Sequence, residues 1–190
     1  MRWHPSTIFT IFAANIHNIV MIDINKIRVV QDFPTPGIKF FDITTILNDA
    51  VEYQNVFNEL LEKAKTYQPD VIVGLEARGY YFAPALALAL KIPFVPIRKK
   101  GKLPYKTYAE SYDLEYGSAS IEIHQDAFPQ HQKVLMFDDI LATGGTAHAA
   151  INLIKKFDPC HINALFLMEL SFLNGREKLQ DVDVESLIIV

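Results

Sequence analysis

The chain has 190 residues, half of them apolar and 12% aromatic, so it is long enough to bury the core of one domain. Its formal net charge of −4 argues against an extended surface for nucleic acid, and we expect no such partner. The single cysteine, Cys160, cannot form an internal disulfide, which agrees with a reducing, cytoplasmic compartment. The most apolar window, residues 82–97, is interrupted by three prolines and Lys91, so we expect a buried helix and strand there and no membrane span.

Residues 1–20 differ in character from the rest of the chain. A short apolar stretch at Ile8–Ala14 follows Arg2, as in a signal peptide, but Asn15, His17 and Asn18 stand where a small-residue cleavage site would be. We favour the hypothesis that residues 1–20 are a non-native or unstructured extension and that residues 21–190 form a single domain. A mass of the natively expressed protein beginning at Met1 would contradict it.

Helix-like and strand-like segments alternate in the remainder of the chain. Two prolines and a glycine predict a rigid turn at residues 32–37, and apolar positions recur with helical spacing over residues 53–67. The polar residues 98–112 predict a long mobile loop. Further patterns predict helices at 80–90 and 145–157, buried strands at 70–74, 92–97, 133–137 and 162–168, a hairpin strand at 118–124 and a last strand at 187–190. This order indicates an α/β domain with a parallel-sheet core flanked by helices.

The most informative segment is VLMFDDILATGGT at residues 134–146, in which a buried strand leads into two acids, a glycine turn and a helix. Ligands of open α/β sheets bind beyond the carboxyl ends of the strands, glycines let the backbone approach them, and a helix start offers free N–H groups. The segment therefore predicts a cradle for one phosphate dianion. We expect Asp138 and Asp139 to accept hydrogen bonds from vicinal sugar hydroxyls. The expected cradle consists of Ala142, Thr143, Gly144, Gly145 and Thr146.

This segment resembles the signature with which type I phosphoribosyltransferases bind phosphoribosyl pyrophosphate (PRPP). The resemblance extends over about residues 27–179 and is to the adenine phosphoribosyltransferases in particular. The matching runs are DFPTPG at 32–37, GLEARG at 74–79, FVPIRK at 94–99, GKLP at 101–104, LEYG at 114–117 and LNGREKL at 173–179. The resemblance implies the type I phosphoribosyltransferase fold, with a small N-terminal hood region and a flexible loop. It also implies transfer of ribose 5-phosphate from PRPP to adenine in purine salvage, a homodimer, and Mg²⁺ held mainly through PRPP.

The matching runs supply further candidate side chains. Arg78 follows a strand at the ligand edge of the sheet, where its guanidinium can bind pyrophosphate oxygens, which is its role in similar enzymes. By resemblance, the basic residues Arg98 and Lys102 clamp the leaving pyrophosphate, and this loop can reach the site of a dimer partner. Glu115 is our candidate for the acid–base residue that manages the proton of adenine, and Tyr116 is expected near the sugar or base. We assign no protein ligand to the metal.

Two positions depart from the family pattern. The family carries Phe-Arg-Asp where this chain has Phe40-Phe41-Asp42, and Tyr105 stands in the loop where glycine is usual. Lys39 and Phe40 lie in the region that forms the adenine pocket in the family, and the ring of Phe40 can stack on a purine. The change at Phe41 leaves open a different purine base as the acceptor. A non-catalytic regulator that senses PRPP or a nucleotide is a second alternative, although the acidic chain offers no DNA-binding module.

Overall fold

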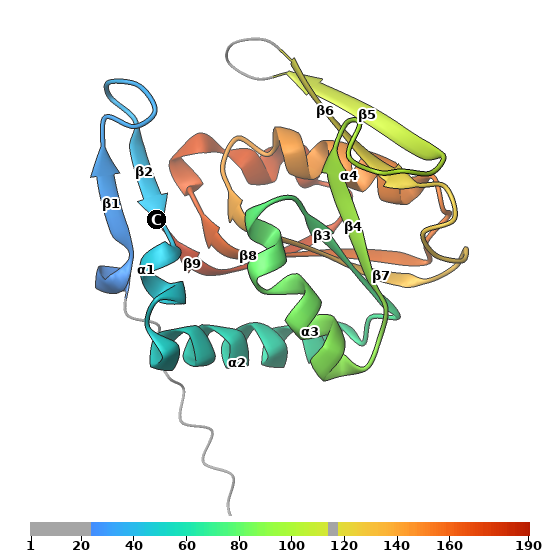
Figure 1. Ribbon diagram of the computed structural model, residues 1–190, viewed down its shortest axis with the longest axis horizontal. Coiled ribbons are helices and arrows are strands. Elements are labelled where there is room, and N and C mark those ends of the chain that lie inside the picture. The colour runs from blue at the N-terminus through green and yellow to red at the C-terminus, as the bar shows by residue number, and fades with distance from the viewer. Residues whose placement is uncertain (1–23, 114–117) are drawn as a thin grey trace, which may run out of the picture.

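A sheet of seven strands forms the centre of the part of the chain that the computed structural model describes, residues 24–113 and 118–190 (Figure 1). The spatial order is β5-β6-β4-β3-β7-β8-β9. Neighbours from β4 to β9 pair in parallel, whereas β6 pairs antiparallel with both β4 and β5. The strands are β3 Val71–Leu75, β4 Phe94–Lys99, β5 Thr107–Asp113, β6 Ser118–His124, β7 Lys133–Leu141, β8 His161–Glu169 and β9 Asp183–Ile189. The predicted parallel core and the predicted hairpin strand are both confirmed.

Helices cover both faces of this sheet, as the alternation of strands and helices predicts. Side chains of β3 alternate between the faces: Val71 and Val73 pack in one core with α4 (Gly145–Lys155), whereas Ile72 packs in a second core with α2 (Ala50–Tyr67) and α3 (Ala83–Leu90). Asp49 caps α2 by accepting the N–H groups of two first-turn residues. The short helices are α1 Thr44–Leu47, η1 Ile24–Lys26, η2 Arg78–Tyr81, η3 Ser171–Leu173 and η4 Gly175–Leu179. Within the described residues, no helix is long and apolar enough to cross a membrane.

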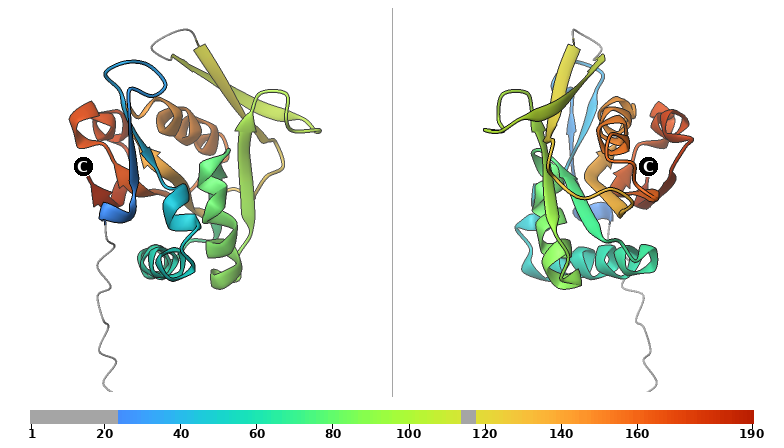
Figure 2. Two further views of the ribbon diagram at one scale, coloured as in Figure 1. Left: turned by 60° about the vertical axis from the view of Figure 1, so that its left-hand side comes forward. Right: turned by 90° about the vertical axis from the view of Figure 1, so that its right-hand side faces the viewer.

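A separate antiparallel hairpin forms the N-terminal hood, the part of the fold that the resemblance implied. It consists of β1 (Arg28–Gln31) and β2 (Lys39–Asp42), joined by the predicted turn, in which Gly37 has a φ of +87° and donates to Asp32. The base of the hood packs on the second core through Phe41 and Ile43. Figure 2 shows the hood and the β5–β6 hairpin rising on the same side of the molecule, near opposite ends of the main sheet.

The prediction of a long loop over residues 98–112 was wrong at both ends. Strand β4 continues to Lys99, and β5 begins at Thr107, so the irregular segment is residues 100–106. The strand escaped prediction because one of its faces is polar, while Tyr108 and Tyr112 on the other face pack on the core beside α4. Strand β7 is also longer than predicted, because it continues through Asp138 and Asp139 to Leu141.

Candidate active site

The phosphate cradle predicted from the sequence is a cavity of about 200 Å³ at the end of β7 and the start of α4. Gly144 adopts a left-handed conformation with a φ of +76°, and it leads into the helix without a side-chain cap. The first N–H groups of α4 therefore face the cavity without a capping side chain, as an anion site requires. The structure brings all five predicted cradle residues together with Asp138 and Arg78, since the lining includes Asp138, Ala142, Thr143, Gly144, Gly145, Thr146 and Arg78.

The two adjacent acids do not face the same way, because neighbouring residues of a strand point to opposite faces. Asp138 is half-buried in the cradle wall, whereas Asp139 is 3% exposed and lines neither this cavity nor the one described below. Burial, and then the charge of Asp139, raises the pKa of Asp138 well above its usual range. Burial also raises the pKa of Asp139, against the opposing charge of Arg78. Of the two carboxylates expected to meet the sugar hydroxyls, only that of Asp138 lines the cradle.

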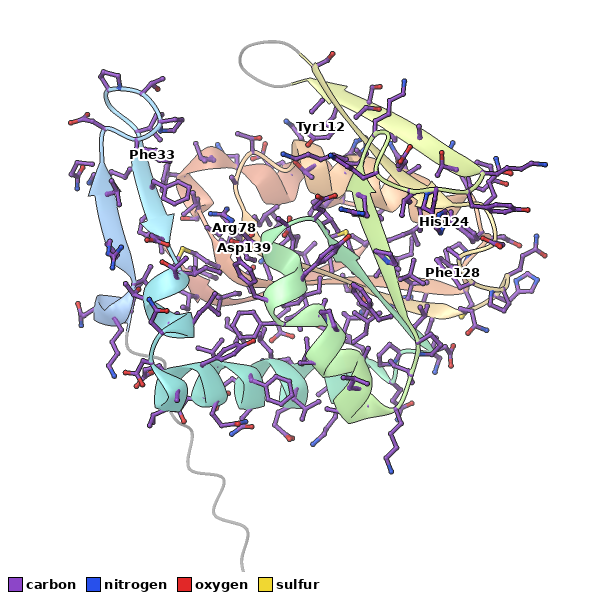
Figure 3. All side chains as sticks on the ribbon, viewed as in Figure 1. Phe33, Arg78, Tyr112, His124, Phe128 and Asp139 are labelled. Atoms are coloured by element: carbon purple, nitrogen blue, oxygen red, sulfur yellow. The ribbon has the colours of Figure 1, made fainter. Side chains whose placement is uncertain are left out.

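Arg78 is the ionic partner of the buried Asp139, and Figure 3 shows the two side chains close together below the hood. The Nε atom of Arg78 lies 2.8 Å from Oδ2 of Asp139, so the charges are in contact. The N–H bond is not aimed at that oxygen, and Oδ2 has no hydrogen-bond donor. The two groups therefore attract each other electrostatically, but the buried Oδ2 atom of Asp139 accepts no hydrogen bond.

A larger cavity of about 680 Å³ lies between the hood and the ends of β7 and β8, and we call it the hood cavity. Lys39, Phe40 and Phe41 line it, so the structure brings both residues of the predicted base pocket to one wall. The ring of Phe40 packs edge-on against Phe33, with centroids 5.1 Å apart, and the guanidinium carbon of Arg78 lies 5.2 Å from its centroid. The remaining lining is mostly apolar: Pro34, Thr35, Gly37, Ile38, Arg78, Ile140, Ala142, Thr143, Leu170, Phe172 and Leu173.

The two cavities adjoin, because four residues line both of them: Arg78, Ile140, Ala142 and Thr143. One cavity offers aromatic and aliphatic surface, and the other offers backbone N–H groups and hydroxyls at a helix N-terminus. A ligand with a flat apolar group at one end and a phosphate at the other fits this combination, and the carboxylate of Asp138 lies in the cradle wall. A nucleoside monophosphate has this shape.

Known proteins with this architecture identify the family. The profile of the phosphoribosyl transferase domain matches residues 44–188. The chain is 49% identical over 168 residues to the adenine phosphoribosyltransferase of Desulfitobacterium hafniense, an alignment that covers 88% of this chain and 97% of the relative. This chain belongs to the adenine phosphoribosyltransferases.

Solved structures of the family have the same fold as this chain. The adenine phosphoribosyltransferase of Thermoanaerobacter pseudethanolicus superposes with a TM-score of 0.79 at 44% identity, covering 87% of this chain and 96% of that one. The enzyme from Saccharomyces cerevisiae, whose structure was determined with an imino-altritol bisphosphate and adenine, superposes with a TM-score of 0.81 at 40% identity, covering 86% and 94%. The predicted type I phosphoribosyltransferase fold is therefore confirmed.

The basic cluster at residues 98–102, at the end of β4, lines neither cavity. Arg98 pairs with Glu76, with Nε 3.0 Å from Oε2, and donates to the carbonyl of Lys102, whose side chain is exposed. The buried carboxylate of Glu122 fixes the loop itself by accepting the N–H groups of three successive residues, Gly101, Lys102 and Leu103. Neither Arg98 nor Lys102 lines the cradle or the hood cavity.

Some of the predicted residues lie outside the part of the chain that the structure describes, and two residues of the hood cavity were not predicted. Glu115 and Tyr116, our candidates for proton transfer and sugar contact, lie outside the described residues, as does the N-terminal extension 1–20. Sequence reasoning missed Leu170 and Phe172, which close the hood cavity from the end of β8. The sequence alone assigns no role to the neighbouring run LNGREKL at residues 173–179.

The carboxylate groups in and next to the cradle suit a Mg²⁺ ion that is also bound by the phosphates of a substrate. Within residues 24–113 and 118–190, no three His, Cys, Asp or Glu side chains cluster as a metal site would require. The carboxylate that lines the cradle is that of Asp138, and its buried neighbour Asp139 has one oxygen without a hydrogen-bond donor. Mg²⁺ commonly takes one or two carboxylates together with substrate phosphates and water, and this donor set suits that arrangement.

Proposed function

We propose that this protein transfers ribose 5-phosphate from PRPP to adenine, forming AMP and releasing pyrophosphate, as a cytoplasmic enzyme of purine salvage. One observation carries the proposal: an apolar aromatic cavity and a helix-capped phosphate cradle share a wall, as the base and the 5′-phosphate of AMP require. Membership of the adenine phosphoribosyltransferases supports the choice of substrates.

The cradle would bind the 5′-phosphate that PRPP and AMP have in common. Its N–H groups from Thr143 to Thr146 and its two threonine hydroxyls supply donors, and the positive end of the α4 dipole favours a dianion. Asp138 would accept hydrogen bonds from the ribose hydroxyls, because its carboxylate lies in the cradle wall. Asp139 would act one step away, by holding the guanidinium of Arg78 at the junction of the cavities.

Adenine would lie in the hood cavity against the ring of Phe40, with backbone groups near Lys39 as hydrogen-bond partners. Arg78 lies over the same ring and also lines the cradle, so a pyrophosphate between the two cavities would meet its guanidinium. Adenine would then attack C1′ from the face opposite to the one from which pyrophosphate departs.

The reaction would be a displacement at C1′ with inversion and dissociative character. The bond from C1′ to pyrophosphate breaks as positive charge develops on the ribose ring, the bond from C1′ to N9 of adenine forms, and the N9 proton leaves. Glu115 would accept the proton that adenine loses, by way of N3 or N7. Tyr116 would lie near the sugar or base. The described residues would contribute chiefly by positioning the reactants and by neutralising the leaving group. Mg²⁺ held by PRPP, with Asp138 as the carboxylate in the cradle wall, would neutralise charge on the departing pyrophosphate.

Arg98 and Lys102 would act across a homodimer, because they line neither cavity of their own chain. Mixing two inactive variants tests this arrangement. If Lys102→Ala and Asp138→Asn are refolded together, one site of each mixed dimer regains both intact residues, and about a quarter of wild-type activity returns. Activity that stays absent in proven mixed dimers would contradict action across the interface.

The decisive experiment measures pyrophosphate release from PRPP and Mg²⁺ with adenine, hypoxanthine, guanine, xanthine and orotate in parallel. Release with adenine alone is the expected result. Asp138→Asn should abolish it, whereas the matched change at the exposed Asp126 should not. Release with another base only would overturn the acceptor and point to Phe41, and silence with all five bases would favour the regulator.

A further inference from the structure

The run at residues 173–179 belongs to the family pattern, yet Gly175 and Arg176 within it line neither cavity. They lie directly after β8, whose last residue Glu169 pairs with Leu141 at the end of β7. The segment that follows β8 is therefore the spatial neighbour of the cradle that follows β7. Figure 1 shows this C-terminal segment beside the start of α4.

Gly175 packs its backbone against the backbone of the cradle. A Cβ atom added to Gly175 would lie far inside normal contact distance of the Ala142 carbonyl, and one added to Gly144 would do the same at the Gly175 carbonyl. Real Cβ atoms essentially never approach other heavy atoms within 3.0 Å, so neither glycine can carry a side chain without moving the other segment. Because Gly144 holds the left-handed turn that opens α4, any displacement of Gly175 is transmitted to the anion-binding N–H groups.

Arg176 fixes the position of Gly175 from the next residue. Its Nε and Nη2 donate to the two oxygens of Glu169, and its Nη1 donates to the carbonyl of Val184 in β9. The side chain of Glu169 is 7% exposed and also accepts the hydroxyl of Ser186 at 2.9 Å. The hydrogen bond from Arg176 lowers the pKa of Glu169 against the opposing effect of burial, so the carboxylate is charged at neutral pH. The ion pair thus ties the segment after β8 to the sheet at two strands.

We propose that Gly175 and the Glu169–Arg176 ion pair are positioning residues for the PRPP phosphate, since together they brace the cradle from behind at Ala142 and Gly144. The proposal rests on the proposed function, because it assigns the cradle to the phosphate of PRPP. The brace touches no reacting atom. It acts by holding the backbone N–H groups where they can donate hydrogen bonds to a phosphate. In such a site, a misplacement of about 1 Å can lower the rate about a hundredfold.

The test separates the phosphate site from the base site with Gly175→Ala and Arg176→Met. Both variants should raise the KM for PRPP about 10- to 100-fold and weaken calorimetric binding of ribose 5-phosphate to the same extent, with the KM for adenine changed less than about threefold. Arg176→Lys should recover part of the loss, because an ammonium can hold one oxygen of Glu169 but not both. Melting temperatures show whether each variant is folded.

The control is Lys63→Met, which removes the Lys63–Glu185 ion pair between α2 and β9 on the opposite face of the sheet. The exposed fraction of Lys63, 42%, is close to the 45% of Arg176, yet its loss should leave the KM for PRPP unchanged. An unchanged KM for PRPP in folded Gly175→Ala or Arg176→Met would overturn the proposal, as would equal rises in both KM values. Absence of transfer in the wild type would instead refute the proposed function, and ribose 5-phosphate binding would still test the brace.

Discussion

Replacing Arg78 with methionine tests the electrostatic centre of the site, because it leaves the buried Asp139 without its counter-charge. The carboxylate is 4% exposed and the guanidinium 34% exposed. Removing one partner of a buried pair costs about 3–5 kcal/mol, and the partial exposure of Arg78 places this pair near the lower end. The lost contact with the ring of Phe40 adds about 0.5–1 kcal/mol. We expect Arg78→Met to lower the free energy of unfolding by about 3–4 kcal/mol.

The pH dependence of this loss has a definite sign. Burial raises the pKa of Asp139 in the folded protein, while the charge of Arg78 opposes the rise, so Arg78→Met raises this pKa further. An acid whose folded pKa is raised contributes stability that is lost as the pH climbs through that pKa. The destabilisation by Arg78→Met should therefore be larger at pH 8 than at pH 5, where Asp139 takes up a proton more readily.

A double-mutant cycle in urea, followed by circular dichroism, measures the coupling directly. Adding Asp139→Asn to Arg78→Met removes the uncompensated charge and should restore about 2 kcal/mol or more. As a control, Lys65→Met breaks an ion pair whose two side chains are each 51% exposed, and it should change stability by less than about 0.5 kcal/mol. Strict additivity of the Arg78 and Asp139 changes would refute the reasoning.

Three further changes probe the separate parts of the site. Asp138→Asn should abolish PRPP binding but increase the free energy of unfolding. Because burial and the charge of Asp139 raise the pKa of Asp138, the increase should be larger at pH 8 than at pH 5. A lower free energy of unfolding in urea at pH 8 would contradict this. Phe40→Leu should raise the KM for adenine about tenfold in steady-state assays and spare the KM for PRPP; equal effects would remove Phe40 from the base site. Gly144→Ala should eliminate calorimetric binding of ribose 5-phosphate, since Gly144 has a φ of +76° and contacts Gly175; wild-type affinity would exclude that constraint.

The sequence predicted the strands that are buried on both faces, whereas it failed to predict a strand that has one polar face. The continuous apolar runs of β3 and β8 signal strands covered on both faces, and the structure confirms them. Strand β5 carries a solvated polar face, and its alternation was masked because Glu110 lies between Tyr108 and Tyr112 on the other face. The end of β7 was placed too early for a related reason, since two acids in a row are typical of a loop.

The site was predictable to the extent that it is continuous in sequence. The strand–turn–helix pattern at residues 134–146 was enough to predict the position of the cradle, because the local backbone geometry directs N–H groups into it. Contacts between distant segments were beyond sequence reasoning: Leu170 closes the hood cavity and Gly175 packs behind the cradle only because β7 and β8 are neighbours in the sheet. That Asp138 lines the cradle and Asp139 does not could be seen only in the structure, because it follows from β7 continuing through both residues.

The phenylalanine that replaces the family arginine at position 41 is accommodated by the core beneath the hood. Phe41 is 8% exposed and packs in the second core cluster, where an unpaired cation would be costly. The hood cavity nevertheless keeps a cation in its wall, because Arg78 reaches it from η2 and lies against the ring of Phe40. The two features from which base binding was argued, the ring of Phe40 and the backbone near Lys39, both line the hood cavity without the arginine. The phenylalanine at position 41 adds apolar surface to the hood cavity and takes nothing from the cradle, which it does not line.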